Sequence, residues 1–339
     1  MTKEVVLMPN NNVTLYAFDA ENGDCLLLVN GMTGFSILID SGPEKRKTSE
    51  ALTSSIKKII KGSPIDLAIV THNDDDHIGG FKYFMENGIE IKKFIFNSHD
   101  FVNKLDVIQR NVKVSYRQDK LLHSSIREKI IELQFDGKSG YFSGMTFDTF
   151  DIKFRSPNRA KLIKYKSWLV NKERNRKVAN TITSLSLEDC KRLAKTDNSF
   201  IEDSREPNGS SLALDISFGD NRLLLLGDAH PTTVINSLNN DNETNHKYDL
   251  VKVSHHGSNK NTNNKLLSLI ECENFLVCSN ATNNHGHPSP ITLTRIVLSN
   301  SNSKLYVTKE NDEMKGIETD FELEFNYPDN GVLEFNYEL

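Results

Sequence analysis

The amino-acid sequence predicts a layered α/β fold. Short apolar runs typical of buried strands recur along the chain, and a helix-like segment with one apolar face, residues 49–61, stands between two of them. Several of the strand-like runs end in histidine or aspartate, at positions where layered α/β proteins often build ligand sites. We therefore expect strands whose ends converge on one functional site.

The N-terminal half supplies the densest group of potential ligands. In order, strands are predicted at residues 13–18, 25–29, 35–39, 65–70 and 92–96, with helices at 49–61 and 81–86. The first two strands form a hairpin, because turn-forming residues separate them. The third ends in Asp40, for which capping of the next segment is the simplest role. The fifth leads to His99, which is either a metal ligand or an ordinary polar residue.

The strand at 65–70 leads directly into Thr71-His72-Asn73-Asp74-Asp75-Asp76-His77-Ile78-Gly79-Gly80. Carboxylates this close repel each other, and cations held between them remove that cost. His72, Asp74, Asp76 and His77 can all point at one small volume from a tight turn. The alternative is a solvated acidic loop, which the ligands at later strand ends disfavour.

The second half repeats this arrangement. Residues 105–135 look mostly helical, and strands are predicted within 142–154 and at 208–214, 223–226, 250–253 and 275–278. The last three of these lead to Asp228, to His255-His256, and to His287. A hairpin is predicted at 320–339, because two alternating apolar segments flank a turn.

Composition limits the class of protein. The chain has 339 residues, 37% hydrophobic and 26% charged, with a net charge of -5. This balance gives no general attraction to nucleic acid. No apolar run approaches the length of a membrane span, and the N-terminus lacks a signal peptide's apolar core. We expect one cytoplasmic domain over residues 1–339, with four scattered reduced cysteines and no membrane contact. The sequence does not identify any protein partner.

A basic stretch interrupts the core pattern. Residues 159–177 carry eight Lys or Arg side chains and a single acid, with Tyr165 and Trp168 among them. We interpret residues 159–207 as a partly helical insertion. It is either a solvated face, as charge runs usually are, or a surface that tracks phosphates and stacks bases. The candidate substrate-binding residues are Lys164, Lys166, Trp168, Arg174 and Arg176.

The ordered motifs resemble those of the metallo-β-lactamase superfamily, and within it the hydrolase domain of ComEC-type competence proteins. The pattern that runs from His72 to Gly80 is similar to HxDxDH-IGG, and His255-His256-Gly257-Ser258 to HHGS. Further similarities are Leu226-Gly227-Asp228 to a Gly-Asp motif, Gly286-His287-Pro288 to GHP, Leu38-Ile39-Asp40-Ser41-Gly42 to LIDGG, and residues 19–24 to a degenerate DxGQGD. The chain departs from that branch in Glu21 and Asn22, in lacking a clear third-motif histidine, and in lacking the membrane channel. The resemblance implies a four-layer αββα sandwich.

The resemblance also implies two divalent metal ions. It assigns His72, Asp74 and Asp228 to the first, and Asp76, His77, Asp228 and His287 to the second, with Asp228 as the bridge. Asp74, where the superfamily often has histidine, favours manganese over zinc. His255 and His256 are adjacent, so we expect one to face the metals and the other to contact a substrate phosphate or protonate the leaving oxygen. His255 and His99 are the remaining candidate ligands.

The function expected from this resemblance is a two-metal phosphodiesterase, foremost a nuclease, with a metal-bound hydroxide as the nucleophile and Asp76 orienting it. Two alternatives stay open. The first is hydrolysis of a small cyclic nucleotide or another small ester, and the second is a non-catalytic binding or sensor module.

Overall fold

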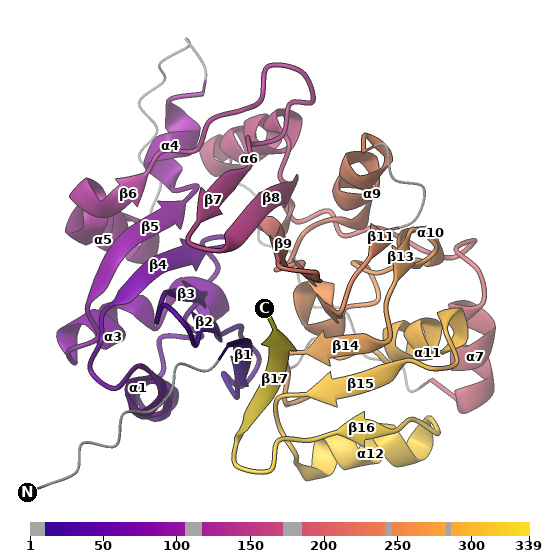
Figure 1. The fold of residues 1–339 in the computed structure, drawn as a ribbon. Coiled ribbons are helices and arrows are strands. Elements are labelled where there is room, and N and C mark those ends of the chain that lie inside the picture. Colours follow the sequence, from indigo (N-terminus) through magenta and orange to yellow (C-terminus); the bar gives the residue numbers. More distant parts are fainter. Residues whose placement is uncertain (1–10, 106–116, 172–184, 242–245, 283–285) are drawn as a thin grey trace, which may run out of the picture.

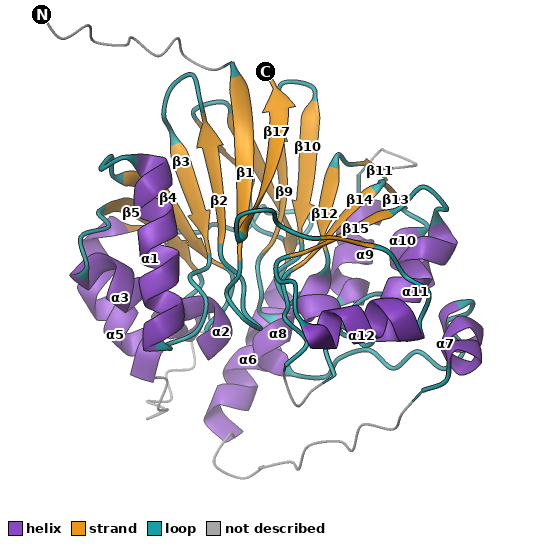
Figure 2. Cartoon of the chain, turned by 90° about the horizontal axis from the view of Figure 1, so that it is seen from below, coloured by secondary structure: helices purple, strands orange, loops and turns teal. Residues whose placement is uncertain are grey.

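A computed structural model of the protein describes residues 11–105, 117–171, 185–241, 246–282 and 286–339. Within these residues two mixed sheets pack face to face (Figure 1). Helices cover the outer face of each sheet (Figure 2). The layers therefore follow the predicted order of helix, sheet, sheet and helix.

The first sheet is built mainly from the N-terminal half. Its order is β17-β1-β2-β3-β4-β5-β6, with β1 (Asn12–Phe18), β2 (Leu26–Asn30), β3 (Ser36–Ile39), β4 (Ile65–Val70), β5 (Ile91–Phe96), β6 (Ile130–Ile131) and β17 (Val332–Glu338). β1 and β2 pair antiparallel, which confirms the predicted N-terminal hairpin. β3, β4 and β5 run parallel, so their C-terminal ends share one edge. Asp40 and His72 lie at that edge.

The second sheet brings the later ligands to the same place. Its order is β16-β15-β14-β12-β10-β9-β8-β7, with β7 (Met145–Phe147), β8 (Phe150–Ser156), β9 (Ala213–Phe218), β10 (Asn221–Leu225), β12 (Leu250–Lys252), β14 (Asn274–Val277), β15 (Lys304–Val307) and β16 (Phe325–Asn326). β10, β12 and β14 are parallel. Their ends carry Asp228, His255 with His256, and Cys278. A small separate sheet pairs β11 (His246–Lys247) with β13 (Ile270–Glu271).

Helices pack on both outer faces. The first sheet is covered by α1 (Arg46–Ile60), α3 (Phe81–Glu86) and α5 (Arg117–Ile126), and the second by α9 (Pro231–Asn239), α10 (Asn264–Leu267), α11 (Pro290–Ser299) and α12 (Asp312–Asp320). α7 (Leu187–Ala194) packs on α11. In Figure 2, α2 (Asp75–Ile78), α6 (Arg159–Asn171) and α8 (Glu206–Gly209) lie below the strand ends, near which α4 (His99–Asn103) also begins.

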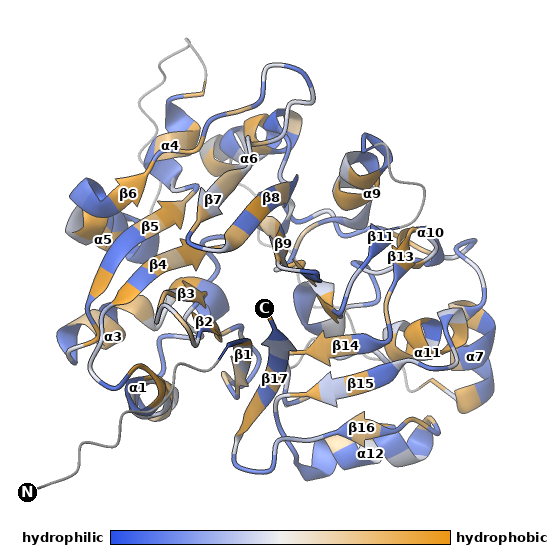
Figure 3. Cartoon of the chain, viewed as in Figure 1, coloured by the Kyte–Doolittle hydropathy of each residue, from blue (hydrophilic) through white to orange (hydrophobic). Residues whose placement is uncertain are grey.

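Three apolar cores hold the layers together. The central core lies between the sheets and includes Leu15, Ile69, Leu214 and Leu225, all nearly inaccessible to solvent. The other two lie between each sheet and its helices. Figure 3 shows largely apolar strands such as β4 and β14, and helices such as α3 and α5 that carry both apolar and polar residues. Truncating such a core leucine to alanine typically costs roughly 2–5 kcal/mol.

The segment between β8 and β9 holds α6, α7 and α8, although β8 and β9 are antiparallel neighbours in the sheet. These three helices are therefore an insertion between two strands that pair directly with each other. Of the three, α6 and α8 lie below the strand ends in Figure 2. Among the described residues, no helix has both the length and the apolar character needed to cross a membrane.

The hairpin predicted at 320–339 is wrong. β16 pairs in parallel with β15 of the second sheet, whereas β17 pairs antiparallel with β1 of the first. β17 follows the whole length of β1, from Asn12↔Glu338 to Phe18↔Val332. This long-range pairing completes the edge of the first sheet, and a local turn pattern does not reveal it.

Candidate metal centre

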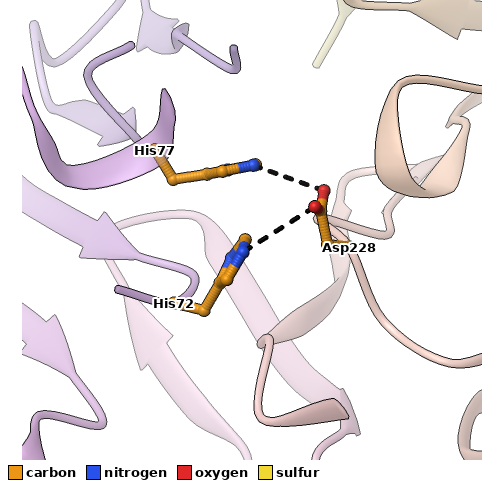
Figure 4. Close-up of side chains that lie close together, drawn as sticks. All are labelled: His72, His77 and Asp228. Atoms are coloured by element: carbon orange, nitrogen blue, oxygen red, sulfur yellow. Dashed lines mark ion pairs between the residues drawn. The ribbon is translucent and has the colours of Figure 1, made fainter. Parts of the chain in front are cut away.

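The strand ends of both sheets meet at Asp228. Figure 4 shows His72 and His77 pointing from the loop after β4 toward Asp228, which follows β10. All three side chains are buried. One backbone hydrogen bond joins the two sheets here, because the amide of Leu212 donates to the Thr71 carbonyl at 2.9 Å. Within the second sheet, the amide of Asp228 donates to the Ser211 hydroxyl at 3.0 Å.

The two oxygens of Asp228 face different histidines. Oδ1 lies 3.3 Å from Nε2 of His77 and 3.8 Å from Nε2 of His256. Oδ2 lies 3.7 Å from Nε2 of His72 and 3.6 Å from Nε2 of His255. A carboxylate placed this way can hold one cation on each oxygen. The predicted bridging role of Asp228 therefore agrees with the geometry.

Each side of this arrangement also has a carboxylate from the loop after β4. Oδ2 of Asp74 lies 3.9 Å from Nε2 of His72, and Oδ2 of Asp76 lies 3.2 Å from Nε2 of His256. Among the described residues, three groups of potential ligands have donor atoms within 4.8 Å of one another: His72 with His77 and Asp228, Asp76 with His77 and His256, and Asp24 with Asp40 and His77. Imidazole and carboxylate donors in this number suit a pair of divalent metal ions.

The second nitrogen of each ring is engaged away from the centre. Nδ1 of His77 lies 2.7 Å from Oδ2 of Asp40, and Nδ1 of His256 lies 2.9 Å from the Cys278 carbonyl. Nδ1–H donation to these oxygens leaves Nε2 as the metal-binding atom, as is usual for histidine ligands.

Four residues provide the same support on the other side of Asp228. Nδ1 of His255 is 3.0 Å from Oδ1 of Asn261. The same Nδ1 lies 3.3 Å from Nδ2 of Asn208 and 3.5 Å from Oδ2 of Asp203. Nδ1 of His72 lies 3.1 Å from the Thr71 hydroxyl. The rings of His72 and His255 are therefore also oriented with Nε2 inward.

The inward atoms fit a cation. Nε2 of His72, His77 and His256 and Oδ1 of Asp228 are buried and have no hydrogen-bond partner of adequate geometry. Such orphaned atoms are rare and costly in folded proteins. A metal ion coordinated by them removes that cost.

Protonation directions agree with this interpretation. Burial lowers the pKa of His72 to about 3, so its ring is neutral, as a ligand must be. Burial alone raises the pKa of Asp228, but the nearby histidines, first His255, hold it well below its usual range. Burial alone lowers the pKa of His256, but Asp228 and the neighbouring Asp24 and Asp76 raise it to about 10. The centre thus favours positive charge.

Glycines allow the chain to pack this tightly. A Cβ on Gly79 would lie 2.2 Å from the amide nitrogen of Glu44, and one on Gly80 would lie 2.2 Å from the Ser41 carbonyl oxygen. Gly227 has φ +49°, and its Cβ would lie 2.5 Å from the Ser211 hydroxyl. These close approaches explain why the Ile-Gly-Gly and Gly-Asp sequences accompany the ligands.

The expectation that only one of His255 and His256 faces the metals is not supported. Both rings reach Asp228, because both residues adopt left-handed backbone conformations, with φ of 48° and 52°. The unusual turn presents consecutive side chains to one volume. Non-glycine residues rarely adopt this conformation, so the sequence gives no signal for it.

Four predicted ligands belong to none of these groups among the described residues: Asp74, His255, His287 and His99. Asp74 and His255 nevertheless lie close to group members, at 3.9 Å from His72 and 3.6 Å from Asp228. The ring of His287 is 4.9 Å from that of His255, centroid to centroid, yet it belongs to none of the groups. His99 begins α4, where its amide donates to Oδ2 of Asp119 and its ring contacts the Asn103 side chain. These contacts are compatible with a structural role, and the ligand role of His99 stays a prediction.

The basic stretch is only partly a surface. Lys164 is exposed, whereas Lys166 donates to the Asn103 carbonyl at 3.0 Å, and Trp168 is half-buried against the central core. Tyr165 is buried and hydrogen-bonds to Asn73, so its predicted role as a base-stacking residue is wrong. It packs inward because Leu162, Tyr165 and Leu169 share one helical face. Arg174 and Arg176 lie outside the described residues.

Sequence reasoning missed the charged groups behind the ligands. Lys252, completely buried in β12, pairs with the buried Asp24 and donates to the Gly227 carbonyl at 3.1 Å. Asp24 also lies 3.4 Å from Nδ1 of His256. A lysine within an apolar strand run was the available signal. Asp203 and Arg205 come from the inserted segment and carried no recognisable motif.

Comparison with known proteins agrees with this architecture. Residues 19–92 match the family model of the metallo-beta-lactamase superfamily. No curated protein sequence matches the chain.

Three similar solved structures come from bacteria and an archaeon. The metallo-beta-lactamase fold protein YhfI from Bacillus subtilis is 15% identical, with a TM-score of 0.41 over 95% of this chain and 100% of that one. Igni18, a metallo hydrolase from Ignicoccus hospitalis, is 11% identical, with a TM-score of 0.43 over 96% and 99%. An isothiocyanate hydrolase from Delia radicum gut bacteria is 12% identical, with a TM-score of 0.43 over 96% and 99%.

Proposed function

We propose that this chain, an α/β protein of the metallo-β-lactamase superfamily and fold, is a metal-dependent phosphodiesterase whose leading substrate is a nucleic acid. One observation carries the proposal: the two oxygens of Asp228 face separate groups of inward Nε2 atoms, several of which have no hydrogen-bond partner. A centre for two cations suits a substrate with anionic oxygens.

The residues would divide between two ions. His72, Asp74, His255 and Oδ2 of Asp228 would hold one; His77, Asp76, His256 and Oδ1 of Asp228 would hold the other. Bound there, two divalent ions supply charge neutralisation of the substrate and lower the pKa of coordinated water. Asp40, Asn261 and the Cys278 carbonyl keep the rings oriented. Because Asp74 adds a hard oxygen donor, we propose manganese ahead of zinc.

The ComEC-type branch is part of the proposal. Its support is the sequence from His72 to Gly80, together with His255-His256-Gly257-Ser258 and Gly286-His287-Pro288. Two of these motifs carry residues of the centre. The sequence from His72 to Gly80 contains four potential ligands, and His255-His256-Gly257-Ser258 contains two. A cytoplasmic location remains a prediction.

A small phosphodiester, such as a cyclic nucleotide, is the second candidate. The burial of Tyr165 and the partial burial of Trp168 favour it, because they remove the stacking surface expected for a polymer. Lys164 remains exposed on α6 and is compatible with either substrate.

A substrate screen tests the proposal. Protein loaded with Mn²⁺, Mg²⁺ or Zn²⁺ is assayed on single-stranded DNA, double-stranded DNA, cyclic nucleotides and a neutral ester, with Asp228→Ala as the inactive control. We expect phosphodiester hydrolysis with Mn²⁺ that this control lacks. Hydrolysis of the neutral ester alone would contradict the phosphodiesterase assignment, and protein that binds no metal would favour the non-catalytic binding or sensor module.

A further inference from the structure

Arg205 meets the metal centre from the solvent side. One guanidinium nitrogen, Nη2, lies 3.0 Å from Oδ2 of Asp74, and 57% of the Arg205 side chain is exposed. Lys252, the cation on the inner side, is completely buried. The two cations therefore differ in what they can reach, since only an exposed guanidinium can contact a molecule that arrives from solvent.

The backbone at Arg205 is fixed on both sides. Its amide donates to Oδ1 of Asp203 at 2.9 Å, and its carbonyl lies 3.1 Å from Nε2 of the buried His230. The amide of Gly209 donates to the same carbonyl at 3.0 Å. Asp203 in turn contacts His255 and the Asn208 side chain. The backbone of Arg205 is thus tied to the ligand histidine, while its exposed side chain pairs with Asp74 at the rim.

The pairing of Arg205 with Asp74 is easily exchanged. The Arg205 side chain is 57% exposed and that of Asp74 is 22% exposed, so solvent reaches the pair, and ion pairs screened by solvent contribute about 1 kcal/mol or less. Oδ2 of Asp74, the oxygen that Arg205 contacts, also lies 3.9 Å from Nε2 of His72. A cation held by His72 and Asp74 would neutralise this carboxylate and weaken its hold on the guanidinium. The planar donors of arginine would then be available to an anion, and they match phosphate oxygens in pairs.

We propose that Arg205 binds an anionic oxygen of the substrate at the rim of the metal centre. This inference rests on the proposed function, in which that oxygen belongs to the phosphodiester. It makes the inserted segment a contributor to substrate specificity, because Arg205 lies outside the core strands that carry the ligands.

The test uses inorganic phosphate as the probe. Calorimetric titration of the Mn²⁺-loaded full chain compares the wild type with Arg205→Gln and Arg205→Lys. Losing a charge-assisted hydrogen bond should weaken phosphate binding roughly tenfold to hundredfold in Arg205→Gln. Arg205→Lys keeps the charge but loses the planar fork, so its affinity should lie between the two. Metal analysis should find the same Mn²⁺ content in all three proteins.

Arg192→Gln is the matched control, because Arg192 is an exposed arginine on α7 of the same inserted segment, paired with Asp189. It should bind phosphate as the wild type does. Unchanged phosphate affinity in Arg205→Gln would overturn the inference, as would loss of Mn²⁺ together with phosphate, which would reveal mere support of Asp74. A wild type that binds phosphate through Arg205 but cleaves no phosphodiester would contradict the proposed function alone.

Discussion

Nδ1 of His77 lies 2.7 Å from Oδ2 of Asp40, and both side chains are completely inaccessible to solvent. Asp40 also accepts hydrogen bonds from the amide and hydroxyl of Thr71, at 2.8 Å and 2.7 Å. Its backbone is left-handed, with φ of 58°. Asp40 therefore orients a ligand histidine, a role that the simple capping interpretation of its strand-end position did not include.

We expect Asp40→Asn to weaken the binding of a metal ion about tenfold to hundredfold, because the amide is a poorer acceptor for the His77 proton. Titration with Mn²⁺ measures this. Asp75→Ala is the matched control, since Asp75 lies in the same ligand loop but is exposed and faces Gln118. Equal affinities in both variants would rule out the orienting role.

Lys252→Met should destabilise the metal-free protein by roughly 3–5 kcal/mol, because it leaves the buried Asp24 carboxylate without its partner. Denaturant unfolding measures the change. The double variant Asp24→Asn with Lys252→Met should recover part of the loss, since it removes both charges. A single variant within about 1 kcal/mol of the wild type would contradict the prediction.

Asp119 should make stability depend on pH. Burial raises the pKa of Asp119 to about 6, although hydrogen bonds from His99 and Asn73 lower it. The charge of Asp100 also raises this pKa, and the charge of Lys120 lowers it. The unfolded value is about 3.9. Because the folded pKa is the higher one, the stabilisation is complete below pH about 4 and is lost as pH rises through about 6.

Asp119→Asn keeps an acceptor without the charge and should remove this dependence. We compare the unfolding free energy of the variant with that of the wild type at each pH. The difference in favour of the variant should be about 1 kcal/mol larger at pH 8 than at pH 5. Denaturant unfolding at the two pH values measures it. A gain that does not change with pH would show that the carboxyl titrates normally.

A nucleic-acid substrate predicts a role for the basic stretch. Replacing Lys164, Lys166, Arg174 and Arg176 by serine should weaken polymer binding and flatten the log–log salt slope by about 0.7 to 0.9 per lost phosphate contact. The matched control replaces four exposed cations of α1, Arg46, Lys47, Lys57 and Lys58. Equal slopes in both variants would make the stretch a solvated face and favour a small phosphodiester.

Local patterns predicted much of this fold. The apolar runs before His72, Asp228 and His255 are strands, and parallel pairing brings their ends to a common edge. The four-layer architecture is confirmed, and residues 19–92 match the superfamily's family model, whereas the ComEC-type branch remains a proposal. Five predicted ligands lie close together in the structure: His72, Asp74, Asp76, His77 and Asp228. They could be predicted because strand-end position and residue type are both local properties of the sequence.

The failures share a physical cause, which is that they depend on distant partners or rare backbone states. β17 was predicted in a C-terminal hairpin but pairs with β1, which is more than 300 residues away in the chain. The left-handed turn at His255 and His256 brought both rings inward. Tyr165 has charged neighbours in the sequence, which suggest an exposed ring, whereas on the helix it shares an apolar face with Leu162 and Leu169. Asp203 and Arg205 reach the centre through tertiary packing alone.

The most direct test of the central claim is the metal content of Asp228→Ala. Purified wild type and Asp75→Ala should each retain two divalent ions per chain after gel filtration. Asp228→Ala should lose both ions, or most of its affinity for them, because the two carboxylate oxygens of Asp228 face histidines on both sides of the centre. An Asp228→Ala protein that keeps two tightly bound ions would contradict the assignment of this site.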